Sequence, residues 1–230
     1  MSPKYVRRIL YGLSALACLA LCLVLGLKYL IQQPPEFYST MLREESQTDS
    51  KSIQEKSESL IEDTIQLRND LANDPEWSFR MTESSANSWL IEHGLTSLVN
   101  EFPSEISNLR IHFEMETIRI AFQWDGKPLR SVVSLAIRPE CVSPNVMEIG
   151  IVDVRAGVLP VAWKRFQEII LSSLRDSGID AEWKNVDSIP TLKIQISPKL
   201  ENRDIAIEKI TAIDKEIRIS GKTSRSKNKK

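Results

Sequence analysis

The sequence predicts an α+β protein in which a single N-terminal transmembrane helix and a helical stalk precede a folded domain. An uncharged apolar run lies near the N-terminus, an acidic segment follows it, and the remainder alternates apolar and polar residues in short stretches. Alternation with period two is typical of half-buried β-strands. We therefore expect a curved, mainly antiparallel sheet of about seven strands, packed around an amphipathic helix.

The apolar run extends from Ile9 to Leu27 and contains no charged residue. A helix rises ~1.5 Å per residue, so this run has about the length of a hydrocarbon core of ~30 Å. We expect a transmembrane anchor over residues 9–31, after a cytoplasmic N-terminus of residues 1–8. A cleaved signal or a lipidated N-terminus is the alternative, because Ala15-Leu16-Ala17 has the small-x-small form of a cleavage site.

Basic residues around the run predict its orientation. Lys4, Arg7 and Arg8 precede it, whereas Lys28 alone follows it closely. Because positive charges favour the cytoplasmic side, the N-terminus is expected in the cytoplasm. The sequence thus predicts a single-pass protein of the cell (inner) membrane whose C-terminal domain is extracytoplasmic.

Residues 32–76 form the expected stalk, in which acidic residues outnumber basic ones. Ile53, Leu60 and Leu67 recur at heptad spacing, which predicts a helix with a thin apolar stripe. One interpretation is a homodimer, joined by a coiled coil here and by the small side chains that recur from Ser14 to Gly26 in the anchor. The other is a solvated helix that lies on its own domain.

The folded domain is expected over residues 77–221, before a basic, disordered tail of residues 222–230. Thr82 is a suitable N-cap for a first helix that ends near Val99. A second helix with one wide apolar face is expected over residues 161–176. The order is helix, four strands, helix, three strands, and the expected strands are residues 109–115, 118–124, 129–137, 147–154, 192–196, 205–210 and 217–221.

Composition and motifs argue against an enzyme and against a general nucleic-acid binder. The formal net charge is −1, and the chain has two histidines. No group of residues has metal-ligand spacing, and the phosphate-binding and nucleophile-elbow motifs are absent from the sequence. Cys141, the one cysteine beyond the apolar run, is expected to be a half-buried loop thiol. We expect no catalytic residue, no cofactor and no metal.

Several of these features together resemble a known family. They are the anchor, the entry helix Thr82-Glu-Ser-Ser-Ala-Asn-Ser-Trp-Leu, the alternating hairpin, the Gly157–Pro160 turn and the closing strand that ends at Gly221. From about Phe79 to Gly221 the chain resembles small membrane-anchored tubular lipid-binding (TULIP-like, YpmS-like) domains, which hold a lipid between a bent sheet and a helix. The resemblance implies a lining made of Trp89, Phe113, Phe122, Trp163, Phe166 and Ile170.

Each of these six residues has an ordinary alternative role, since a packed core needs the same residue types. Two function hypotheses follow. The first is a membrane-tethered, extracytoplasmic, non-catalytic module that binds a lipid or another hydrophobe. The second is a single-pass envelope scaffold or assembly protein whose β-rich domain docks other proteins. An apolar cavity open at one end would favour the first, and a solid core with an exposed sheet edge the second.

Overall fold

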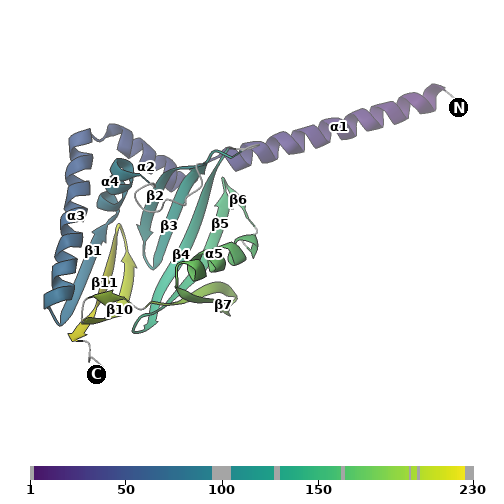
Figure 1. Ribbon diagram of the computed structural model, residues 1–230. Coiled ribbons are helices and arrows are strands. Elements are labelled where there is room, and N and C mark those ends of the chain that lie inside the picture. Colours follow the sequence, from purple (N-terminus) through teal and green to yellow (C-terminus); the bar gives the residue numbers. More distant parts are fainter. Residues whose placement is uncertain are drawn as a thin grey trace.

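The computed structural model of the protein describes residues 3–94, 105–126, 130–161, 164–196, 198–200 and 203–225. The strand pairs are antiparallel and the larger sheet has seven strands, so the predicted α+β class and the mainly antiparallel sheet are confirmed (Figure 1). The helices are α1 (Pro3–Gln32), α2 (Glu36–Gln47), α3 (Ser50–Asn73), α4 (Glu83–His93) and α5 (Lys164–Asp176). The strands are β1 (Glu76–Thr82), β2 (Ile106–Glu114), β3 (Thr117–Trp124), β4 (Ser131–Ser143), β5 (Val146–Ala156), β6 (Leu159–Pro160), β7 (Asp180–Val186), β8 (Ile189–Gln195), β9 (Lys199–Leu200), β10 (Arg203–Ile213) and β11 (Glu216–Arg225).

The strands form two sheets where the sequence predicted one. The larger sheet has the order β2-β3-β4-β5-β8-β7, with β6 paired to β5, and the smaller has the order β1-β11-β10-β9. Strands β1 and β7 were not predicted. Strand β1 pairs along its whole length with β11 at the other end of the chain. Such a long-range pair leaves no mark in the local spacing of apolar residues.

An asparagine in the β4–β5 turn helps to join the two sheets. Asn145 has a positive φ of 64°, a conformation that asparagine tolerates better than most residues. Its Nδ2 donates to the carbonyl oxygen of Ile205 (2.8 Å), and its Oδ1 accepts from the backbone N–H of Ile207 (2.7 Å). Ile207 lies at a bulge in β10, so this side chain satisfies backbone groups that the β-ladder leaves unpaired.

The N-terminal part of the chain is helical in α1, whose side chains are described from Leu16 onward. Within the described residues, no single helix is long and apolar enough to cross a membrane. The segments Leu16–Gln32 and Glu36–Gln47, bent by 52° at the break between them, satisfy the length and composition required when taken together. The transmembrane anchor over residues 9–31 therefore stays a prediction.

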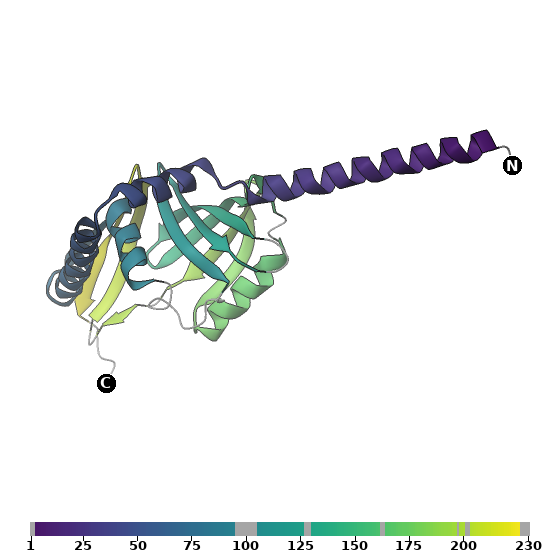
Figure 2. The same cartoon turned by 90° about the horizontal axis from the view of Figure 1, so that it is seen from above.

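The segment expected to form the stalk consists of two helices, α2 and α3, which lie against the domain (Figure 2). On α2, Tyr38 is buried, with 2% of its surface exposed. On α3, Ser57 is fully buried and Leu60 is 9% exposed. Because α4 presents small residues such as Ser85 and Ala86, the two helices pack closely along this stripe. The heptad residue Leu60 is therefore engaged within this chain.

The free edge of β2, an end strand of the larger sheet, is covered by polar side chains of α4. The Asn87 amide both donates to the carbonyl oxygen of Ile111 (2.7 Å) and accepts from its N–H (2.9 Å). The Glu83 carboxylate accepts from the backbone N–H of Phe113 (2.9 Å). Thr82 caps α4 through the N–H of Ser85, as predicted, and thereby fixes the position of both side chains. An edge covered in this way cannot add a further strand.

Three further expectations differ from the structure. Strand β11 continues to Arg225, because the backbone of Lys222 to Arg225 pairs with β10 and Thr223 is buried, so the disordered tail does not begin at residue 222. Cys141 lies in β4 rather than in a loop, and burial raises the pKa of its thiol. The sheet was expected to pack around the second amphipathic helix. This helix, α5, instead packs on Ala181, Leu192 and Ile194 of β7 and β8 at one end of the larger sheet. At the other end of the larger sheet α4 contacts β2, while α3 contacts α4 and strand β1 of the smaller sheet.

Tyr38 provides a test of how firmly α2 is attached. Its hydroxyl donates to the carbonyl oxygen of Asn108 (2.9 Å), and burial raises its pKa to about 12. Unfolded tyrosine titrates near ~10, so the unfolded chain ionises first as the pH rises. The stability contributed by this group is fully present below pH ~10 and is lost as the pH rises through ~12, by about 2–3 kcal/mol.

We therefore expect Tyr38→Phe to remove this part of the alkaline destabilisation. The measurement is urea unfolding of the full chain between pH ~9 and ~12, compared with the wild type. Tyr29→Phe is the matched control, because Tyr29 is 68% exposed. If Tyr38→Phe and wild type lose stability in parallel, the tyrosine is not held in the protonated form.

Candidate hydrophobe-binding groove

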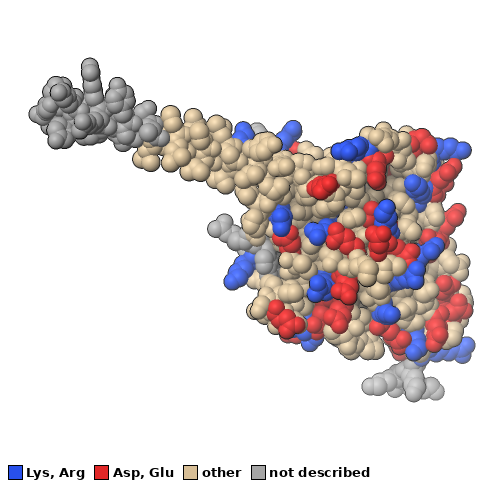
Figure 3. All heavy atoms as spheres, turned by 180° about the vertical axis from the view of Figure 1, so that it is seen from behind, with Lys and Arg blue, Asp and Glu red and all other residues tan. Residues whose placement is uncertain are grey.

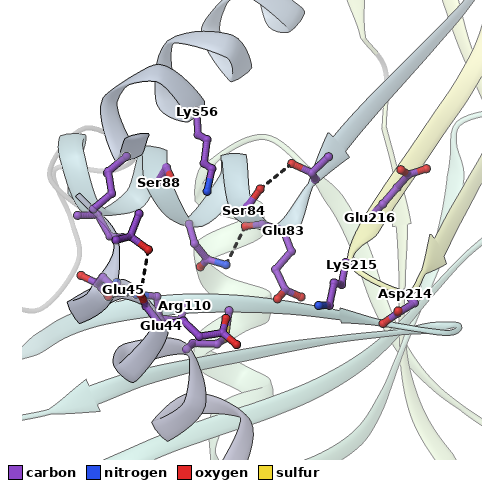
Figure 4. A pocket seen from close by; sticks show the side chains of 16 residues that line it. Glu44, Glu45, Lys56, Glu83, Ser84, Ser88, Arg110, Asp214, Lys215 and Glu216 are labelled. Atoms are coloured by element: carbon purple, nitrogen blue, oxygen red, sulfur yellow. Dashed lines mark hydrogen bonds and ion pairs between the residues drawn. The ribbon is translucent and has the colours of Figure 1, made fainter. Parts of the chain in front are cut away.

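Two hollows lie beside the α3–α4 pair. One is an apolar groove of about 570 Å³ between α3, α4, β1 and β2. The other is a polar cleft of about 410 Å³ between α2, α3, α4, β2 and the β10–β11 turn (Figure 4). Both have the size of small-molecule sites, which typically measure ~300–1,000 Å³. The apolar groove is lined by Leu60, Ile61, Thr64, Ile65, Leu67, Phe79, Met81, Ala86, Trp89, Leu90 and Ile111.

The apolar groove is assembled from segments with different periodicities. On α3, Ile61 and Ile65 are one helical turn apart and lie on the same side of the helix. On β1, Phe79 and Met81 alternate with polar residues and therefore share one face of the strand. Trp89 of α4 is half-buried, and its ring contacts that of His93 with 5.3 Å between centroids. The groove thus has an aliphatic side and an aromatic side.

The described side chains that line the apolar groove are almost entirely apolar. None of the eleven lining side chains is charged. Thr64 carries a hydroxyl, which donates to the carbonyl oxygen of Leu60 (2.8 Å) in its own helix. Ile65 is 57% exposed and Ile61 is 38% exposed, so apolar surface at this site faces water. A contiguous apolar surface of this kind is typical of an interaction or ligand site.

The polar cleft is chemically different, because its central charges are engaged with one another. Arg110 is almost fully buried, and its Nη2 and Nε lie 2.6 and 3.1 Å from Oε2 of Glu45. Glu83 accepts from the backbone of β2 and lies 2.7 Å from Nδ1 of His112. Lys56 and Lys215 point into the remaining space (Figure 4). These contacts connect α2, α4 and β2, so we interpret the side chains of the cleft as a network that holds these elements together.

Among the residues that the structure describes, no group of His, Cys, Asp and Glu side chains is arranged to hold a metal ion. Cys141 donates to the carbonyl oxygens of Ser143 and Ile207, at 3.2 and 3.3 Å. His93 lies in the last turn of α4.

The six residues predicted to line a lipid site lie in different places. Trp89 lines the apolar groove. Phe113 of β2 is 1% exposed and belongs to the core, and Phe122 of β3 is half-buried. Ile170 of α5 packs against the cluster on β7 and β8. Trp163 and the side chain of Phe166 lie outside the described residues, as does the expected end of the first helix near residue 99.

Sequence reasoning missed most of the groove because its α3 side had been assigned to the stalk. The apolar stripe was visible in Leu60, Ile61 and Leu67, and the alternation of Phe79 and Met81 was also present. What the sequence did not contain was the pairing of β1 with β11, which carries Phe79 and Met81 next to α3.

Comparison with known proteins adds no relative. No protein-family model, curated protein or solved structure matches this chain. Function must therefore be argued from the geometry and the chemistry of the groove.

Proposed function

We propose that the protein is a membrane-tethered, non-catalytic module that binds a lipid or a similar hydrophobic molecule in the apolar groove. The observation that supports this is a hollow of about 570 Å³ with an uncharged lining of eleven residues. The sequence resemblance to tubular lipid-binding domains is in keeping with the same function. The extracytoplasmic location and the anchor over residues 9–31 are part of the proposal, and they rest on the apolar run and its basic flank.

The energetics favour an apolar ligand. Burial of each methylene group contributes about 0.8 kcal/mol, so a ten-carbon segment gains roughly 8 kcal/mol. Association costs about 4 kcal/mol or more in lost translational and rotational freedom, and the gain from a long alkyl chain offsets the lower part of this range. A charged ligand would lose its hydration in the groove without finding a side chain of opposite charge among the described lining residues. The groove therefore selects for alkyl or aryl groups, with any polar head left in water.

Other observations bear on the scaffold alternative and on nucleic acid. Strand addition at β2 is blocked, because Asn87 and Glu83 occupy its free edge. On the face in Figure 3, acidic and basic side chains are interspersed over the domain. A protein that tracks a phosphate backbone needs a basic patch instead. The apolar groove is thus the surface feature that we propose to be functional.

Photolabelling tests the proposal directly. The full chain in lipid nanodiscs is irradiated with a diazirine analogue of palmitic acid, and labelled residues are mapped by mass spectrometry. We expect labels on the groove segments of α3 and α4. Ile65→Glu places a charge on the exposed apolar rim and should reduce groove labelling about tenfold, which corresponds to ~1.4 kcal/mol.

Gln66→Glu is the matched control, since it adds the same charge one position along α3 and does not line the groove. Labelling of α1 by the probe in the bilayer is an internal reference, which neither substitution should change. Equal groove labelling in Ile65→Glu and Gln66→Glu, or no groove label in the wild type, would contradict the proposed function.

A further inference from the structure

The end of α1 is bonded directly to the larger sheet. The last carbonyl groups of a helix have no partner within it. Here the carbonyl oxygen of Leu30 accepts from the backbone N–H of Val158 (3.1 Å). The next carbonyl oxygen, that of Ile31, accepts from the hydroxyl of Ser131 (2.8 Å). Two orphan acceptors are thus satisfied by two different parts of the sheet, the β5–β6 turn and the first residue of β4.

Glycine at position 157 makes this approach possible. Gly157 has a φ of +62°, and it is the first central residue of the two-residue turn between β5 and β6. A glycine with positive φ at this position suits a tight hairpin. A Cβ atom here would overlap the carbonyl oxygens of both Leu30 and Ile31. These are backbone atoms, which cannot rotate away, so any larger residue would push α1 off the sheet.

The chain is fixed on the other side of the break as well. After Pro34-Pro35, α2 is held by the buried Tyr38, whose hydroxyl bonds to Asn108 on β2. Rotation of α1 about the break would therefore have to disrupt the contacts of Leu30 and Ile31. We name these contacts, made by Leu30 and Ile31 with Ser131, Gly157 and Val158, the α1 joint.

The α1 joint determines where the groove lies. In Figures 1 and 2, α1 leaves the domain at one end, while α3 and α4 lie at the opposite end. A compact domain with the number of residues that follow α1 is roughly 40 Å across. An acyl chain spans half of a hydrocarbon core, which is only ~15 Å. A lipid in the bilayer crossed by α1 therefore cannot place its acyl chain in a groove at the far end of the domain without leaving that bilayer.

We infer that the α1 joint holds the groove out of reach of the bilayer crossed by α1, so that the groove loads its hydrophobic ligand from a separate lipid source. This inference rests on the proposed function for the ligand, but the rigidity of the joint stands apart from it. The ligand class is an acyl-chain lipid, and the two sources to be distinguished are the protein's own bilayer and a second lipid surface.

The rigidity of the joint is measured by spin-label distances in the full chain. Cys22 on α1 carries one label, Glu62→Cys on α3 carries the other, and Cys18 and Cys141 are replaced by serine. In nanodiscs the wild-type joint should give a narrow distance distribution. Gly157→Val should broaden it by about twofold or more, because the helix can then swivel. A broad wild-type distribution, or no change in Gly157→Val, would overturn the inference.

Two further variants keep this test interpretable. Gly150→Ala lies on the same strand β5, and its new Cβ would meet its nearest neighbour, the Cγ2 of Ile189, at 3.4 Å, so the distribution should stay narrow. Ser131→Ala removes the bond to Ile31 without touching the turn, and should broaden the distribution less than Gly157→Val does. If circular dichroism shows that Gly157→Val does not fold, the distance distribution of Ser131→Ala decides whether the inference stands.

The source of the ligand is tested with a photoreactive phosphatidylcholine placed either in the protein's own phosphatidylcholine vesicles or in separate vesicles of the same lipid. We expect groove labelling from separate vesicles to exceed labelling from the own bilayer by about tenfold, a difference of ~1.4 kcal/mol. Gly157→Val should raise labelling from the own bilayer. Labelling mainly from the own bilayer would overturn the inference and leave the proposed function standing. No groove labelling from either source would overturn both.

Discussion

Replacing Phe113 by alanine is expected to lower the free energy of unfolding by about 3–5 kcal/mol, the range typical of large-to-small changes of a buried aromatic. Phe113 is 1% exposed on β2. Its backbone N–H and carbonyl are bonded to Glu83 and to the N–H of Lys215. Because the flanking elements are fixed in this way, they cannot close the cavity that the truncation leaves. Urea unfolding of the full chain, followed by tryptophan fluorescence, measures the loss.

Met115→Ala is the control for this prediction. Met115 lies in the adjacent β2–β3 turn and is 75% exposed, so its truncation should change stability by less than ~0.5 kcal/mol. The same experiment decides between two interpretations of Phe113. If it lined a ligand groove, its truncation would enlarge an existing space, and the loss would be far smaller than for a core residue. A loss below ~1 kcal/mol would therefore favour the lipid-lining hypothesis for Phe113.

The strands predicted from the sequence share one property, apolar residues that recur at every second position over part of their length. Separate strands are expected over residues 109–115 and 118–124, and β2 and β3 are indeed separated there. In β7 the alternation consists of Ala181 and Trp183 between polar neighbours. A repeat of two apolar residues is too short to predict a strand. Periodicity thus located strands with a clearer apolar repeat than that of β7.

The arrangement of these elements was harder to predict than their existence. Pairing of β1 with β11 and of β5 with β8 depends on chain segments far apart in the sequence. The candidate groove depends on the first of these pairs, and Trp89 contributes to it, whereas Phe113, Phe122 and Ile170, the other proposed lining residues whose side chains are described, do not. Likewise, Gly157 was recognised as part of a turn, but its contact with the end of α1 required the three-dimensional structure.

Polar residues buried between elements were also invisible in the sequence. Asn87 and Asn145 each satisfy both backbone groups of a strand edge or bulge, yet each occupies a position that reads as an ordinary surface residue. The hydrogen-bonding role of such an amide can be recognised only when its partners in the structure are known. Asn87 fixes α4 on β2, and Asn145 fixes the β4–β5 turn on β10.

Removing the Glu45 carboxylate is expected to destabilise the protein by about 3 kcal/mol, the lower end of the range for breaking a buried ion pair. The Arg110 side chain is 6% exposed and that of Glu45 is 27% exposed. Glu45→Ala therefore leaves a guanidinium that is buried without its anionic partner. Its Nη1 still donates to the carbonyl oxygen of Leu109 (2.7 Å), but this neutral acceptor does not balance the charge.

Combining Glu45→Ala with Arg110→Met should recover most of the loss, because the costly species is the unpaired charge rather than the missing contact. Glu44→Ala is the matched control. Its side chain is exposed one position earlier on α2, and its removal should change the unfolding free energy by less than ~0.5 kcal/mol. The measurement is a double-mutant cycle by urea unfolding of the full chain. If the double variant is as unstable as Glu45→Ala, the pair acts through packing of α2 on β2 and not through the compensation of a buried charge.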